Sequence, residues 1–217
     1  MTKKRVAVLI SGRGSNMAAL ITAAKSARYP AEIVLVLSNR PEAAGLAAAQ
    51  AAGIATAVVD HAAYGKDREA FERKMQDVLA AHGIELLCLA GFMRLLTPWF
   101  VDGWQGRMIN IHPALLPAFK GLDTHARALA VGVKIHGASV HFVVSDMDAG
   151  PIIMQGAVAV HEDDTADALA ARVLAIEHRI YPAALALVAS SRVKVVDGRC
   201  VIEGTRAGAD HLIVPEI

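Results

Sequence analysis

The sequence predicts an α/β fold, a Rossmann-like, doubly wound and mostly parallel sheet with an antiparallel C-terminal extension. Short runs rich in branched aliphatic residues are apolar on both alternating faces, as strands of a parallel sheet covered by helices must be. Longer alanine-rich, helix-prone segments separate these runs, which is the pattern of βαβ units. After Pro113 two long extended runs are joined by a short loop only, and a parallel crossover would need about a dozen residues or more.

The elements are expected in the following order. Strands cover 5–10, 32–37, 55–59, 85–90 and 108–111, and helices at about 16–28, 42–52 and 66–82 separate the first four. A short helix near 124–131 precedes the extended runs at about 135–144 and 151–160. A helix from about 165 to 189 follows, with Asp163 or Asp164 as its N-cap. A weak hairpin over 192–203 turns at Asp197-Gly198, and we expect a loosely held tail after about 204.

Composition limits the class of protein. The chain has 217 residues, 54% of them hydrophobic, and a net charge of +1, which excludes a disordered chain and argues against a nucleic-acid binder. The apolar run 6–10 is shorter than the ~7–15 residues of an export signal, and no segment approaches the ~20 apolar residues of a membrane span. Two cysteines cannot form a disulfide framework, so we expect a reducing, cytoplasmic environment.

A glycine-rich loop follows the first expected strand and opens a helix. Its sequence, Ser-Gly-Arg-Gly-Ser-Asn over 11–16, brings backbone N–H groups of a helix start close to a ligand, which favours an anion such as phosphate. A tight turn that binds nothing is the alternative. Met17 stands at the third glycine position of a dinucleotide fingerprint, and no acid follows the second strand, so a phosphate monoester is the better candidate.

Two polar side chains end the fifth strand. Asn110 and His112 lie two residues apart, so they point to the same side of the sheet, at the carboxyl end where α/β proteins bind ligands. A single strand-end histidine is more often structural. Burying both groups without partners would cost roughly 1–3 kcal/mol each, which favours a functional role for the pair.

Three further segments are ambiguous on their own. The loop 146–151, Asp-Met-Asp-Ala-Gly-Pro, is typical of an ordinary turn. His136 and His141 are five residues apart and therefore on opposite faces of a strand, so we expect no metal site there. The stretch 91–96, Gly-Phe-Met-Arg-Leu-Leu, could line a pocket for a flat heterocycle or pack as a helix.

Taken together, six stretches resemble the glycinamide ribonucleotide formyltransferase family of the formyltransferase superfamily. In the order of the family they are 8–16 (VLISGRGSN), 89–94 (LAGFMR), 110–117 (NIHPALLP), 136–143 (HGASVHFV), 147–151 (MDAGP) and 177–182 (EHRIYP). They extend over most of the chain. Asn-x-His-Pro with a later Asp-x-Gly-Pro marks the superfamily, and the glycine loop with Ser15-Asn16 marks this branch.

The resemblance implies a formyl transfer from 10-formyltetrahydrofolate, as co-substrate, to the amine of glycinamide ribonucleotide, with small-molecule partners only, no metal, and a monomer or homodimer. It implies these site residues: Asn110, His112 and Asp148 for catalysis; Gly14, Ser15, Asn16, Asn110 and Glu177 for the ribonucleotide; and Arg68, Met93, Arg94, Leu95, Leu96, Val144, Ser145, Asp146, Met147 and Asp148 for folate. Ser145 stands where the family usually has an acid or a bulkier apolar residue, and Arg13 replaces a residue that varies in relatives.

The same resemblance implies a single domain, 1–217, with a nucleotide-binding half at about 1–112 and a folate-binding, catalytic half at about 113–190. Two alternatives stay open. A formyltetrahydrofolate hydrolase would share the folate site and use water as acceptor, although such relatives usually carry an extra N-terminal domain. A non-catalytic nucleotide-binding module would use the glycine loop alone and leave Asn110, His112 and Asp148 without a purpose.

Overall fold

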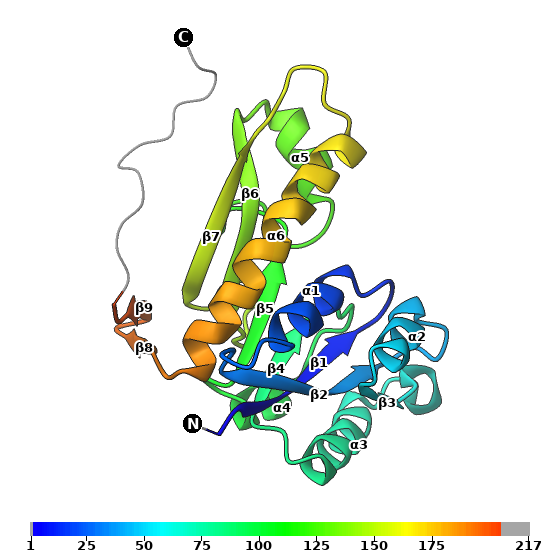
Figure 1. Ribbon diagram of the computed structural model, residues 1–217. Coiled ribbons are helices and arrows are strands. Elements are labelled where there is room, and N and C mark those ends of the chain that lie inside the picture. Colours follow the sequence, from blue (N-terminus) through cyan, green and yellow to red (C-terminus); the bar gives the residue numbers. More distant parts are fainter. Residues whose placement is uncertain (1, 205–217) are drawn as a thin grey trace.

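A computed structural model of the protein describes residues 2–204. Its centre is a seven-stranded sheet in the order β3-β2-β1-β4-β5-β6-β7, shown in Figure 1. The elements are β1 (Lys4–Ile10), α1 (Ser15–Ala24), β2 (Ala31–Ser38), α2 (Ala44–Ala51), β3 (Ala55–Val58), η1 (His61–Tyr64), α3 (Arg68–Ala81), β4 (Leu86–Leu89), α4 (Pro98–Gly103), β5 (Met108–His112), α5 (Thr124–Val131), β6 (Ile135–Phe142), β7 (Ile152–Ala159), α6 (Ala166–Ala189), β8 (Val193–Val196) and β9 (Arg199–Ile202).

The sheet confirms the predicted fold class. Strands β1 to β5 pair in parallel, while β6 pairs antiparallel with both β5 and β7. The carboxyl ends of β1, β4 and β5 therefore meet at one edge of the sheet. Strand β6 lies next to β5 and runs in the opposite direction. This arrangement places the glycine loop and the end of β5 on the same side of the molecule.

Helices cover both faces of the sheet. Residues of α1, α2 and α6 pack with one face into a large apolar cluster, and residues of α3 and α4 pack with the other face into a second cluster. In Figure 1 the long α6 extends along β6 and β7 and reaches α1. It lies so close to β7 that a Cβ added to Gly156 would stand 2.5 Å from Ile176 Cγ1, so this contact requires a glycine.

Four details differ from the sequence predictions. The first helix ends at Ala24, not near 28, because the amides of Lys25 and Ser26 bond to carbonyls three residues back, and this tightened turn ends the helix. The 3₁₀ turn η1 was not expected. Neither was α4, although Thr97, whose hydroxyl accepts from the Phe100 N–H, and Pro98 form a typical helix start.

The fourth difference is the cap of α6. Neither Asp163 nor Asp164 caps this helix: the N-cap is Thr165, whose hydroxyl accepts from the Ala168 N–H at 3.2 Å. The Asp164 carboxylate is already occupied, since both of its oxygens lie 2.8 Å from the Arg172 guanidinium. Because Asp164, one residue before the N-cap, is held in an ion pair, the Thr165 hydroxyl caps the helix.

The C-terminal hairpin forms as predicted. β8 and β9 make a separate two-stranded sheet, and Asp197 and Gly198 both have positive φ, at 49° and 73°, as a tight hairpin turn requires. The expected loose tail lies outside the described residues. No helix within residues 2–204 is long and apolar enough to cross a membrane.

Candidate active site

The glycine loop leaves β1 and starts α1. Gly14 is the N-cap and has φ 73°, a conformation that favours glycine, and within residues 2–204 no side chain bonds to the N–H groups of the first turn of α1. A pocket of about 290 Å³ opens in front of these groups, lined by Ser11, Gly12, Arg13, Gly14, Ser15, Asn16, Arg40, Ala90, Gly91 and Met93. Open N–H groups and two guanidinium groups at one pocket make it suited to an anion.

Asn16 connects this loop to α6. Its Nδ2 donates to Glu177 Oε2 at 2.6 Å, and both side chains are buried. Burial raises the pKa of Glu177, and the hydrogen bond from Asn16 opposes this rise. The Asn16 Oδ1 atom is also buried and has no hydrogen-bond partner among the described residues.

At the end of β5, Asn110 and His112 point to one face of the sheet, as predicted. Asn110 pairs with His141 of β6, and His112 pairs with Ser139, so both residues lie next to β6. Ser139 itself donates to the Ala114 carbonyl at 2.7 Å and accepts from the Leu116 N–H at 3.0 Å. The chain beyond His112 is thereby fixed to β6.

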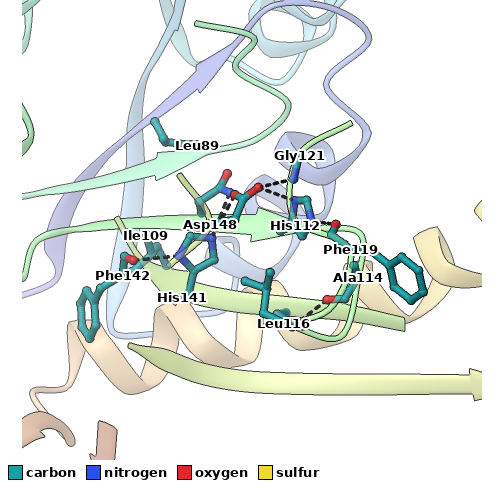
Figure 2. A network of polar contacts seen from close by, with 12 residues as sticks. Leu89, Ile109, His112, Ala114, Leu116, Phe119, Gly121, His141, Phe142 and Asp148 are labelled. Atoms are coloured by element: carbon teal, nitrogen blue, oxygen red, sulfur yellow. Dashed lines mark hydrogen bonds and ion pairs between the residues drawn. The ribbon is translucent and has the colours of Figure 1, made fainter. Parts of the chain in front are cut away.

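Asp148 is the residue that completes the cluster. It has φ 50°, a strained conformation for a residue with a side chain, and its Oδ2 lies 3.3 Å from His112 Nδ1. The Gly121 N–H donates to the same oxygen at 2.9 Å. Figure 2 shows the carboxylate between His112 and His141. Sequence reasoning expected Asp148 beside His112, and the structure brings the two together from segments 36 positions apart.

Both nitrogens of His112 face oxygen atoms. Nε2 lies 3.0 Å from the Phe119 carbonyl oxygen, which can only accept, so Nε2 carries a hydrogen. Nδ1 is then the nitrogen that gains or loses a proton. It faces the Asp148 carboxylate, and the two side chains are only 7% and 11% exposed, so this contact is shielded from solvent.

Sequence reasoning missed His141, which it considered only as a metal ligand. Its Nδ1 donates to the Phe142 carbonyl at 2.8 Å, and its Nε2 lies 3.2 Å from Asn110 Nδ2 and 3.8 Å from Asp148 Oδ1. Burial lowers the pKa of His141, which favours the neutral ring and leaves Nε2 as an acceptor for one N–H of Asn110. His141 thus orients the Asn110 amide, whose second N–H remains available.

His136 lies on the opposite face of β6, as the spacing predicted. Its ring packs edge-on against Phe119 and His125, at 5.7 Å and 5.3 Å between centroids, and burial lowers its pKa to about 4. Within residues 2–204 no group of three or more His, Cys, Asp or Glu side chains is arranged to hold a metal ion.

The residues expected around folate form a looser set. The segment after β4 is not a helix, and it is fixed at one end by the Met93 N–H, which donates to Ser11 Oγ at 2.7 Å. Met93, Leu95 and Met147 are more than half exposed, an unusual state for large apolar side chains and suited to a flat ligand. Among the described residues, the side chains of Arg68 and Arg94 make no hydrogen bond or ion pair with protein groups.

Comparison with known proteins decides the family. The model of the family described as "Formyl transferase" matches residues 4–185, which include the glycine loop, the end of β5, Asp148 and Glu177. The chain belongs to the formyl transferase family. The predicted family resemblance is therefore confirmed.

Individual relatives agree with this assignment. This formyl transferase is 42% identical over 201 residues to the phosphoribosylglycinamide formyltransferase of Escherichia coli, covering 93% of this chain and 94% of the relative. It is 50% identical over 193 residues to the trifunctional purine biosynthetic protein adenosine-3 of Bos taurus, covering 89% of this chain. The chain spans about a fifth of that protein's length, 19%.

Solved structures show the same fold. Glycinamide ribonucleotide transformylase 1 from Symbiobacterium toebii superposes with a TM-score of 0.89 at 44% identity, covering 92% of this chain and 94% of that one. A formyltetrahydrofolate deformylase from Pseudomonas syringae superposes with a TM-score of 0.85 at 28% identity, covering 93% of this chain and 66% of that one. The same fold thus occurs in a transformylase and in a deformylase, so the fold alone does not distinguish these two activities.

Proposed function

We propose that this protein transfers a formyl group from 10-formyltetrahydrofolate to the amine of glycinamide ribonucleotide, in purine biosynthesis. The products are formylglycinamide ribonucleotide and tetrahydrofolate. One observation carries the proposal. Asn110 and the His112–Asp148 pair lie at the same edge of the sheet as the anion pocket and the buried Asn16–Glu177 pair. A hydrolase would have no need of a nucleotide pocket.

The ribonucleotide binds across the two halves of the chain. In this proposal its phosphate accepts from the backbone N–H groups of Gly14 and Ser15 at the start of α1, where the helix dipole favours negative charge. The Glu177 carboxylate and the unpaired Asn16 Oδ1 accept from the ribose hydroxyls. Residues 1–112 therefore supply most of the nucleotide site, and α6 closes it from the second half.

Folate binds against the other side of the cluster. We propose that the pterin lies between the exposed segment containing Met93, Arg94, Leu95 and Leu96 and the loop 144–148, and that Arg68 meets the glutamate end. Apolar side chains on both walls suit a flat ring, and a free guanidinium suits a carboxylate. This placement sets the formyl carbon beside Asn110 and His112.

The chemical step then follows from the positions of the donors. The substrate amine attacks the formyl carbon and forms a C–N bond, and the carbonyl oxygen becomes an oxyanion. The free N–H of Asn110 and the protonated Nδ1 of His112 donate to this oxygen, and the charge-assisted bond is the stronger one. Asp148 accepts, through water, the proton that the amine loses.

Collapse of the intermediate breaks the bond between the formyl carbon and N10 of folate, which takes up a proton. The transfer moves no electrons between substrates, so the chemistry calls for neither a redox cofactor nor a metal. Holding two large substrates together can contribute up to roughly 7–11 kcal/mol to the rate. The buried, fixed cluster supplies the remainder through preorganised donors.

The decisive experiment follows the formyl donor. Purified protein is mixed with 10-formyltetrahydrofolate, with and without glycinamide ribonucleotide, and loss of the donor and gain of formate are measured. Donor loss only with the ribonucleotide, without formate, supports the transferase. Formate release without the ribonucleotide supports the hydrolase, and saturable ribonucleotide binding without any turnover supports a binding module.

A further inference from the structure

We propose that Arg127 is a positioning residue for this active site, because it clamps the backbone of the loop that holds both His112 and Asp148. We call residues 119–123 the clamp loop. The inference rests on the proposed function for its kinetic consequences, but the contact network on which it depends is a property of the structure alone.

The clamp loop touches the cluster at two backbone atoms. The Phe119 carbonyl accepts from His112 Nε2 at 3.0 Å, and the Gly121 N–H donates to Asp148 Oδ2 at 2.9 Å. The first contact fixes which nitrogen of His112 carries its hydrogen, and the second stabilises the negative charge of Asp148. A shift of this loop would therefore disturb both groups at once.

The clamp loop does not hold this shape by local preference. Phe119 and Asp123 have φ of 53° and 56°, and Gly121 has φ 82°. The first two are left-handed conformations that residues with side chains rarely adopt, and such strain persists only where surrounding contacts impose it. Contacts from outside the clamp loop must therefore hold these conformations in place.

Arg127 supplies these contacts from the first turns of α5. Its Nη1 donates to the Lys120 carbonyl at 2.6 Å and to the Leu122 carbonyl at 3.3 Å, and its guanidinium lies 5.7 Å from the centre of the Phe119 ring. These carbonyls belong to the residues on either side of Gly121. The planar guanidinium reaches two carbonyls and one ring face together, which a lysine ammonium cannot do as well.

Loss of the guanidinium would leave the strained loop without this support. We expect Arg127→Ala to lower kcat roughly 10- to 100-fold, because displacement of catalytic groups by about 1 Å has effects of this order. The KM for the ribonucleotide should stay within about twofold, since Gly14, Asn16 and Glu177 lie on other elements.

Arg107→Ala is the matched control. Arg107 also donates to a backbone carbonyl, that of Gly103 at 2.6 Å, and also stacks on an aromatic ring, that of Trp104 at 4.7 Å, but it belongs to the surface after α4. It should leave kcat and the His112 tautomer unchanged. Arg127→Lys keeps the positive charge but loses the planar guanidinium, so it should recover part of kcat, whereas a role of the charge alone predicts complete recovery.

A second readout does not depend on turnover. In protein with ¹⁵N-labelled histidine, the neutral His112 ring should carry its hydrogen on Nε2 in the wild type. In Arg127→Ala the neutral ring should be a mixture of the two tautomers. Wild-type kcat and a wild-type His112 tautomer in Arg127→Ala would overturn the proposal, as would equal losses in Arg107→Ala. Absence of ribonucleotide-dependent turnover in the wild type would instead refute the proposed function, with the tautomer still testing the clamp.

Discussion

Removing the charge of Asp148 should separate catalysis from folding. Asn fits the same space, and its Oδ1 can still accept from the Gly121 N–H, which Asp148 accepts at 2.9 Å. Asp148→Asn therefore keeps the loop in place while it removes the negative charge that faces His112. We expect a folded protein in which His112 no longer faces a negative charge.

The size of the effect can be worked from the geometry. Opposite unit charges at the 3.3 Å between His112 Nδ1 and Asp148 Oδ2 attract by about 5 kcal/mol at an effective dielectric constant of ~20. If about 3 kcal/mol of this acts at the transition state, kcat falls roughly 100-fold. The proton acceptor for the amine is lost in the same variant, so the loss should be at least of this order.

The assay is the ribonucleotide-dependent loss of 10-formyltetrahydrofolate, with a urea unfolding curve for each protein. Asp197→Asn, in the exposed turn between β8 and β9, removes a carboxylate far along the chain and should behave as wild type. A kcat for Asp148→Asn within about threefold of wild type, with the fold intact, would refute the assigned role of this ion pair.

Three further predictions test separate parts of the structure. Gly14→Val should raise the KM for the ribonucleotide roughly 10- to 100-fold, because hydrogen bonds to a charged phosphate contribute about 1.5–3 kcal/mol. The substitution disturbs the loop, since Gly14 has φ 73° and a Cβ there would lie 3.2 Å from Gly45 Cα. An unchanged KM would mean that the phosphate binds elsewhere. Burial lowers the pKa of His136 to about 4, so between pH ~6.5 and 4 the unfolded chain binds a proton at this residue and the folded chain does not. The free energy of unfolding therefore falls by about 1.4 kcal/mol for each pH unit over that range, and urea titrations at pH 7, 6 and 5 should show a shallower fall for His136→Gln. Gly150→Ala would place a Cβ 1.8 Å from the Phe142 carbonyl oxygen, and urea unfolding should show a loss of roughly 1–3 kcal/mol, whereas wild-type stability would show that the turn can relax.

Much of the fold follows from local patterns in the sequence. The parallel strands were predictable because both of their faces are apolar, and the same-side placement of Asn110 and His112 follows from the two-residue period of a strand. The hairpin turn at Asp197-Gly198 likewise depends only on the residues within it. Such features need no knowledge of what packs against them.

Features that depend on distant contacts escaped prediction. Asp164 is a good N-cap by type, but Arg172 occupies its carboxylate, and this ion pair is known only when the helix has been placed against the preceding loop. His141 joins the site because the antiparallel register sets it opposite Asn110, and that register is not fixed by either strand alone. Its position, an odd number of residues from His136, placed it on the right face without identifying its partner.

The resemblance in the sequence predicted which groups react, but it could not predict what holds them. Asp148 and His112 carry recognisable motifs because their chemistry demands a carboxylate and an imidazole. The clamp loop acts through a carbonyl and an N–H, which every residue but proline offers, so no residue type marks it. Backbone contacts of this kind can be supported by different side chains, and here Arg127 does so. Positioning groups are therefore found from coordinates, while reacting groups can be found from sequence.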